Sequence, residues 1–136
     1  MDYIARDMGA GVRAIRQAER HAATAKAATY MYRFNWQCPG FNGKYGAPHG
    51  AEIVFVNGDP SKMDVLTHNT PEAQALAAKM NLAWIAFART GDPNTPGLPR
   101  WEPYSLDSRA NMHFDNHSTL VRDPESEIRK LWAKIT

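Results

Sequence analysis

The residues best suited to proton transfer lie in the string Gly46-Ala47-Pro48-His49-Gly50-Ala51-Glu52, which precedes a short apolar run. Pro48 fixes its own φ and Gly50 lacks a Cβ, so the imidazole of His49 can project from a tight turn. A histidine side chain exchanges protons near neutral pH and is the usual general base. His49 is therefore the predicted catalytic residue, and a loop histidine with a structural hydrogen bond is the simpler alternative.

A general base needs a nucleophile, and the sequence offers few. It contains five serines: Ser61, Ser105, Ser108, Ser118 and Ser126. None lies in a G-x-S-x-G elbow, and no P-loop or G-x-G-x-x-G phosphate loop is present. The single cysteine, Cys38, precedes His49 by eleven residues, so a Cys38–His49 hydrolase is an open alternative. A buried structural cysteine is the simpler interpretation, because no thiolate-stabilising helix N-terminus is predicted there.

A second group of polar residues lies in the string His113-Phe114-Asp115-Asn116-His117. On a strand that runs into a turn, His113 and Asp115 could share a face with metal-ligand chemistry. A solvated strand face is the simpler interpretation. A single cysteine provides neither a disulfide framework nor a cysteine-based zinc site. We expect no metal and no cofactor.

Length and composition limit the possible classes. The chain has 136 residues, is 43% hydrophobic and carries a formal net charge of +2, which suits one globular domain. The balanced charge indicates no nucleic-acid partner. No apolar run approaches the roughly 18 residues of a membrane span, and the N-terminus does not open as a signal peptide. We expect a soluble protein without a membrane partner, and its compartment stays unknown.

The elements that position His49 are predicted from periodicity and turn residues. We expect a single partial domain over residues 1–136, with an amphipathic helix over 1–27 (clearest at 3–25) leading into it. Residues 28–34 read as a strand that is apolar on both faces and suits a larger sheet. A glycine-rich loop over 36–46 then delivers His49.

The middle of the chain contains the clearest helix signal. Residues 51–56 predict a short strand or a single helical turn, and residues 61–69 predict irregular structure. A helix over 71–90 follows, with Asn69 or Thr70 as N-cap, Pro71 in the first turn and Gly91 beyond its end.

The last third predicts a hairpin and a helix. Residues 91–103 are rich in proline and predict a surface crossing, and residues 110–115 alternate as a half-buried edge strand. Residues 119–121 predict its partner strand. A final helix begins near Asp123, with four residues expected to point inward: Ile128, Leu131, Trp132 and Ile135.

Five stretches resemble the type-B carboxylesterase family, the cholinesterase and para-nitrobenzyl esterase group of α/β-hydrolases. They are residues 30–36, 46–53, 83–94, 98–104 and 112–115, and together they cover roughly residues 28–125 in the family's order and spacing. The similarity is to the C-terminal quarter of such enzymes. It implies an α/β fold class: the C-terminal part of an α/β-hydrolase, with about three helices and two to four strands of a larger sheet.

The resemblance also implies roles for residues. His49 matches the general base of a Ser-His-Glu/Asp triad, and Glu52 matches an acidic residue that is structural. The family's serine elbow, triad acid and oxyanion-hole glycines lie upstream of the matched region and are absent from this chain. The family's Phe-Val-Phe-Gly is replaced by Phe55-Val56-Asn57-Gly58, which alters the expected acyl-pocket wall.

Two functions from different classes follow. In the first, the chain contributes His49 to a carboxylic ester hydrolase that acts on small esters, and the 136-residue chain alone is inactive. In the second, it is a non-catalytic, interaction-prone remnant that self-associates through exposed sheet edges.

Overall fold

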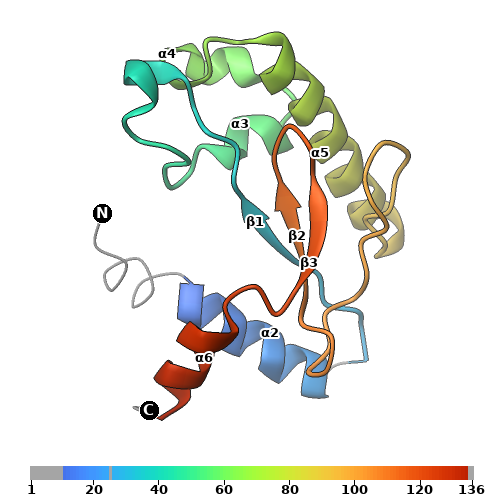
Figure 1. Ribbon diagram of the computed structural model, residues 1–136. Coiled ribbons are helices and arrows are strands. Elements are labelled where there is room, and N and C mark those ends of the chain that lie inside the picture. The colour runs from blue at the N-terminus through green and yellow to red at the C-terminus, as the bar shows by residue number, and fades with distance from the viewer. Residues whose placement is uncertain (1–10, 25, 135–136) are drawn as a thin grey trace. The chain divides into compact units, whose positions relative to one another are not determined.

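The computed structural model describes residues 11–24 and 26–134 (Figure 1). Its α-helices are α2 (Val12–Thr24), α3 (Glu52–Val56), α4 (Asp64–Thr67), α5 (Pro71–Thr90) and α6 (Ser126–Ala133). The strands are β1 (Met31–Phe34), β2 (Ala110–Phe114) and β3 (Thr119–Arg122), and the 3-10 helices are η2 (Gly40–Gly43) and η3 (Pro60–Met63). Helices and strands in this mixture are a partial α/β fold, as predicted.

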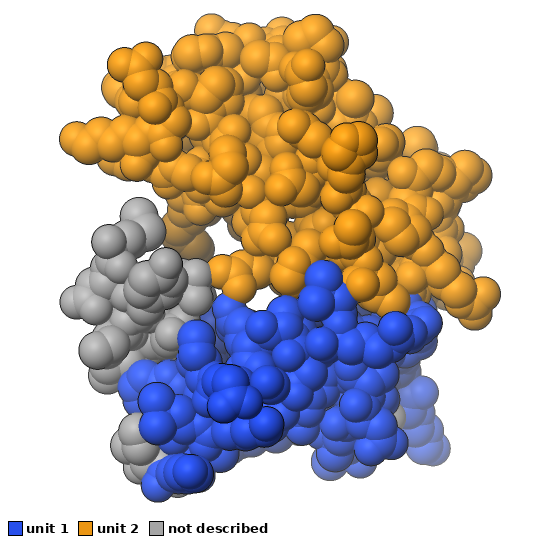
Figure 2. Space-filling model, viewed as in Figure 1, with its two compact units in different colours: residues 1–31, 102–111, 121–136 blue, residues 32–101, 112–120 orange. Residues whose placement is uncertain are grey.

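The chain forms two compact units (Figure 2). Unit 1 contains the described residues of 1–31, 102–111 and 121–136, and unit 2 contains 32–101 and 112–120. The single partial domain over 1–136 stays a prediction. No helix in the described ranges is both long and apolar enough to cross a bilayer.

The three strands form one sheet in the order β1-β2-β3. Along β2, Ala110, Met112 and Phe114 are fully buried and the residues between them are half-buried, which confirms the predicted alternation. The prediction of an edge position for β2 is wrong, because β1 pairs on one side and the hairpin partner β3 on the other.

β1 is shorter and more exposed than predicted. The backbone N–H of Tyr104 donates to the carbonyl of Thr29 at 2.7 Å, so a residue just after the crossing segment binds the chain just before β1. Tyr32 is 37% exposed, and among the described strands β1 lies at the end of the sheet. The strand predicted over 28–34 is therefore present only as β1, and its place in a larger sheet stays a prediction.

Charged side chains join separate segments of unit 1. Arg109 pairs with Glu19 of α2 and donates to the Tyr104 hydroxyl at 3.0 Å. Burial is the main cause that raises the pKa of Tyr104, so this phenol stays protonated. The predicted amphipathic helix is present as α2 but ends at Thr24. Its proposed first residues, 3–10, lie outside the described residues.

The prediction for the last helix is correct in position, but of its expected inward residues Ile128 and Trp132 are only half-buried and Leu131 is exposed. α6 follows Asp123, whose carboxylate binds Arg129 through two hydrogen bonds of 3.1 and 2.6 Å. No described residue of α6 is buried, and Leu131 is 58% exposed. The ion pair links the helix to the loop residue that precedes it. Ile135 lies outside the described residues.

The helix over 71–90 is confirmed as α5. The Thr70 hydroxyl accepts a hydrogen bond from the Ala73 N–H at 3.2 Å, and Pro71 occupies the first turn. Gly91 ends the helix with φ 77°, and its N–H donates to the carbonyl of Phe87 at 2.8 Å.

The prediction of irregular structure over 61–69 is wrong. Pro60 opens η3, and the buried Thr67 of α4 donates its hydroxyl to the Pro60 carbonyl at 2.8 Å. His68 and Asn69 then take positive φ values of 49° and 41° and end the helix. These helical turns are too short to show a periodic apolar pattern in the sequence. The left-handed residues that end α4 are His68 and Asn69, so no glycine marks the end of this helix.

Gly40 is where η2 lies closest to α4. A Cβ on Gly40 would lie 2.2 Å from the carbonyl oxygen of Val65 and 2.6 Å from the Cα of Leu66. Gly43, in the same turn, has open space around it but a φ of 73°. The loop that leads to His49 is therefore set by backbone contact.

We expect Gly40→Ala to lower the free energy of unfolding by about 3 kcal/mol, because backbone atoms of α4 must move. The matched variant Gly43→Ala should cost about 1 kcal/mol, from the left-handed φ alone. Denaturant unfolding of both variants measures the difference. Equal losses would contradict the close approach.

The Asp123–Arg129 pair predicts a loss of stability in acid. The hydrogen bonds from Arg129 lower the pKa of Asp123 in the folded state. The pair's contribution, about 1 kcal/mol, is then complete above the unfolded carboxyl pKa of about 3.9 and is lost as pH falls through the folded value. Unfolding of the wild type and Asp123→Asn from pH 6 to 2 should converge at the acid end. Glu127→Gln, at an 88% exposed carboxylate, is the control and should have no effect.

Candidate active site

His49 lies in a closed four-residue turn. The N–H of Ala51 donates to the carbonyl of Pro48 at 3.1 Å, and Gly50 in the third position has φ 83°. This is the backbone that a type II turn requires, and glycine allows it. The His49 side chain is exposed, as the sequence predicted from Pro48 and Gly50.

The turn is attached to a rigid core through α3. Ala51 is 1% exposed and Phe55 is fully buried. The Phe55 ring lies with its centroid 4.9 Å from that of Phe34 and 5.1 Å from that of Trp36. Trp36 is itself fixed, because its indole N–H donates to the Asn116 side chain at 2.9 Å. α3 is thus anchored by Phe55 near its end and by Ala51 just before its start, where the turn lies.

The other end of α3 is held by α5, against which it packs (Figure 1). The Asn81 amide donates to the carbonyl of Val56 at 2.8 Å. Gly58, at φ 76°, lets the chain turn beneath Asn81, where a Cβ would meet its Cγ at 3.2 Å. A five-residue helix is unstable alone, so α3 depends on these tertiary contacts for its stability.

The loop before His49 is closed at its base. The N–H of Cys38 donates to the carbonyl of Gly46 at 2.9 Å. Two exposed aromatic side chains, Phe41 and Tyr45, stand on this loop with ring centroids 5.3 Å apart. Phe41 has a φ of 55°, which is unfavourable for a bulky residue. The predicted loop over 36–46 is therefore an ordered structure that contains η2.

Glu52 follows the turn and is half-buried in the first turn of α3. Burial is the main cause that raises the pKa of Tyr32, and the charge of Glu52 adds to it. The Tyr32 ring packs edge-on against Trp84 at 5.0 Å and Phe114 at 5.9 Å between ring centroids. Glu52 therefore acts electrostatically on the aromatic core of unit 2.

The described serines all have other hydrogen-bond partners. Ser61 donates to Asp59, Ser118 to the Asp115 carbonyl and Ser126 to Glu127, while Ser105 and Ser108 pair with each other. Within the described ranges, the His49 side chain makes no hydrogen bond or ion pair. The structure thus brings His49 together with no hydroxyl nucleophile among these residues.

Cys38 does not suit a nucleophile either. The side chain is free and the residue only 1% exposed, and desolvation raises the pKa of its thiol above the ordinary value. A thiol attacks as the thiolate, so a raised pKa lowers its reactivity. The Cys38–His49 alternative is disfavoured, and the structural interpretation of Cys38 fits its environment.

The polar string after β2 is divided among different partners. His113 is half-buried, and its Nδ1 lies 3.2 Å from the Asn35 amide, so its face is not simply solvated. Asp115 lies beyond the strand end and accepts from the N–H of Asn116. In the part of the chain that the structure describes, no three His, Cys, Asp or Glu residues are grouped as a metal site would need.

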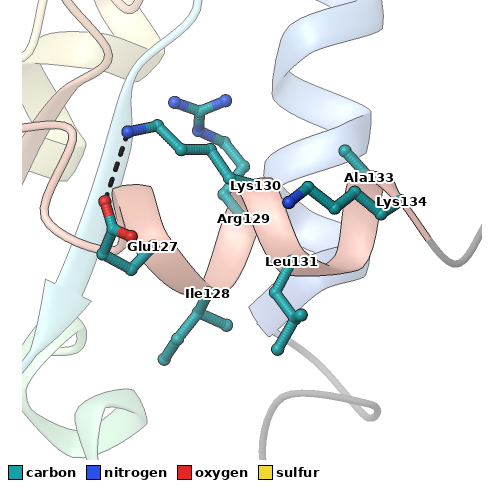
Figure 3. A pocket seen from close by; sticks show the side chains of 7 residues that line it. All are labelled: Glu127, Ile128, Arg129, Lys130, Leu131, Ala133 and Lys134. Carbon is teal, nitrogen blue, oxygen red and sulfur yellow. Dashed lines mark hydrogen bonds and ion pairs between the residues drawn. The ribbon is translucent and has the colours of Figure 1, made fainter.

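A separate hollow of about 650 Å³ lies along α6 in unit 1 (Figure 3). Ile128 and Leu131 point to the same side of the helix, and Glu127 pairs with Lys130 at 3.2 Å. The hollow is lined by Glu127, Ile128, Arg129, Lys130, Leu131, Ala133 and Lys134. These residues include no nucleophile paired with a base, so the hollow has no catalytic arrangement of its own.

Solved structures identify the architecture as part of an α/β-hydrolase esterase. A thermophilic PNB esterase superposes with a TM-score of 0.75 at 32% identity, over 86% of this chain and 24% of its own. The *Geobacillus stearothermophilus* carboxylesterase EST55 superposes with a TM-score of 0.72 at 36% identity, over 87% of this chain and 24% of its own.

The sequence comparisons identify the family. The Carboxylesterase family model matches residues 1–132. Para-nitrobenzyl esterase of *Bacillus subtilis* is 33% identical over 76% of this chain and 21% of its own length, and chicken acetylcholinesterase is 41% identical over 66% and 12%. The chain belongs to the carboxylesterase family. It spans about a fifth of the length of the para-nitrobenzyl esterase.

Sequence reasoning missed the residues that hold the site. Asn81 and Asn116 are polar residues on a helix and in a hairpin turn, and nothing local marks the Val56 carbonyl or the Trp36 indole as their partners. Both contacts join residues at least 25 positions apart. Only the three-dimensional arrangement reveals them.

The buried environment of Cys38 predicts low thiol reactivity. We expect negligible alkylation by iodoacetamide at pH 7.5 in the native chain and complete alkylation in denaturant. Leu131→Cys in a Cys38→Ser background is the control, since that position is 58% exposed and should react in the native state. Rapid native alkylation of Cys38 would contradict this placement.

Proposed function

We propose that this chain contributes His49 as the general base of a carboxylic ester hydrolase whose serine and triad acid come from outside these 136 residues. The observation that carries the proposal is the exposed imidazole on a turn anchored by buried Phe55, in a chain of the carboxylesterase family. A base must be fixed in place and still reach its substrate, and this placement meets both needs.

The chemistry assigned to His49 has two steps. An imidazole nitrogen takes the serine hydroxyl proton as the serine oxygen attacks the ester carbonyl, and then gives that proton to the departing alcohol. Water repeats the sequence on the acyl-enzyme and releases the carboxylic acid. Glu52 is assigned a structural role, because its electrostatic influence is on Tyr32 in the aromatic core.

The substrate proposed for the complete enzyme is a small carboxylic ester. Curated relatives at 29–42% identity include a para-nitrobenzyl esterase, carboxylesterases and a bile salt-activated lipase. One structural relative is described as hydrolysing aliphatic aromatic polyesters. An ester carbonyl is the reacting group common to these activities, so it is the class proposed here.

A chimera tests the role of His49. This chain replaces the matching segment of the *Bacillus subtilis* para-nitrobenzyl esterase, and hydrolysis of p-nitrophenyl butyrate is measured. We expect His49→Ala and the near-isosteric His49→Asn to lower kcat by roughly a thousandfold or more, because proton transfer is lost. The isolated chain should have no activity above buffer.

His117→Ala is the matched control, because this histidine is also exposed and lies in the same unit. It should leave kcat unchanged in a folded chimera. A chimera that keeps its activity with His49→Asn would overturn the assignment. Activity of the isolated chain would instead show that a nucleophile lies within it.

A non-catalytic role is the second candidate. The observation that favours it is the engagement of every serine hydroxyl in local hydrogen bonds, which leaves His49 without a hydroxyl partner in the described part of the chain. An inactive but folded chimera would favour this role.

A further inference from the structure

Helix α5 has two opposite apolar faces. The inner face packs on α3 and contains five buried residues: Ala73, Leu76, Ala77, Met80 and Ala83. The outer face contains Ala75, Ala78, Leu82 and Ile85, and all four are exposed. A surface helix normally has one apolar face and one polar face, so a second apolar face requires its own explanation.

The outer residues follow the spacing of a helix-pairing seam. Positions 75, 78, 82 and 85 alternate steps of three and four, which keeps them on one line along the helix. Leu82 is 52% exposed and Ile85 is 40% exposed. A Cβ placed on Gly97 would lie 3.9 Å from two carbons of the Lys79 side chain, next to this face. The seam is open to a neighbouring helix over about three turns.

The sizes of the seam residues favour an antiparallel neighbour with the same sequence. The small residues Ala75 and Ala78 lie in the first half of the seam, and the large Leu82 and Ile85 in the second half. An antiparallel copy sets each large side chain against a small one, which fills the space between the helices. A parallel copy would leave a void between alanines and crowd the large residues together.

The charges at the two ends agree with this orientation. Glu72 is exposed at the start of α5, three positions before Ala75, and Arg89 is exposed at its end, four positions after Ile85. In an antiparallel pair, Glu72 of each chain lies near Arg89 of the other, so the attraction occurs twice. In a parallel pair, like charges face each other at both ends.

We propose that a second copy of this chain binds along the outer face of α5, forming an antiparallel two-fold helix pair centred between Ala78 and Leu82. The interface uses the same residues on both chains and closes at two copies. It differs from self-association through sheet edges, which would add further copies at each edge. The proposal is independent of any role of His49.

Sedimentation of the full chain measures the association directly. We expect a monomer–dimer equilibrium with a Kd in roughly the micromolar range, since the interface is small. Leu82→Lys should weaken it roughly tenfold or more, because a charge enters the seam. The matched control is Val65→Lys, at a residue of the same unit that is 61% exposed and off the seam, and it should leave the Kd unchanged.

A charge exchange tests the orientation without altering the apolar residues. Glu72→Lys and Arg89→Glu should each weaken the dimer, and the double variant should restore it. Both substitutions oppose the helix dipole, so restoration cannot arise from a more stable helix. Circular dichroism of each variant confirms that α5 stays folded.

Disulfide cross-linking in a Cys38→Ser background gives a second test of orientation. Chains with Ala78→Cys mixed with chains with Leu82→Cys should form a mixed disulfide dimer, and neither variant should cross-link efficiently with itself. A monomer up to roughly a hundred times the expected Kd, an equilibrium insensitive to Leu82→Lys, or self-cross-linking of Leu82→Cys would each overturn the proposal. Association without a two-chain limit would also overturn it and point to the sheet edges.

Discussion

The packing of Phe55 against Phe34 and Trp36 is the contact on which the candidate site depends. α3 has only five residues, and a helix of that length cannot hold its own conformation in water. The complete burial of the Phe55 ring fixes the direction of the α3 axis, because the neighbouring rings restrict both the position and the tilt of Phe55. The turn that bears His49 inherits this fixed position through Ala51. The position of the exposed His49 therefore depends on the fully buried ring of Phe55.

The contacts that position His49 are distinct from the groups with which it would react. Among the described residues, the contacts that orient the His49 turn come from unit 2. In the role proposed for His49, a serine and an acid approach this histidine from other parts of a longer carboxylesterase-family fold. A rigid base reduces the ordering that must accompany such an encounter, and this is where a preformed scaffold contributes to catalysis. Glu52, three residues along, contributes through its field on Tyr32 and not through a bond to the imidazole.

Local rules predicted the elements whose causes are local. Thr70, Pro71 and Gly91 fix both ends of α5 through their own chemistry, and the sequence displays them directly. Pro48 and Gly50 likewise predicted the exposure of His49. The failures concern surroundings that no local pattern states: β2 lies between β1 and β3 in the sheet, and Leu131 is 58% exposed on α6. The helical turns over 60–67 were missed because they are shorter than the window in which a period can be counted. Local sequence patterns do not reveal which residues far apart in the chain contact each other.

The hydrogen bond between the Cys38 N–H and the Gly46 carbonyl has a consequence for how this loop can vary. It ties together the two ends of a segment whose tip, around Phe41 and Tyr45, is exposed. Extra residues placed at that tip would lengthen a closed ring, and the added closure entropy grows only with the logarithm of its length. The two ends of the loop would keep their present separation, so an insertion at the tip would not move His49. The loop can therefore change its length and surface chemistry during divergence while the residue that follows it keeps its place.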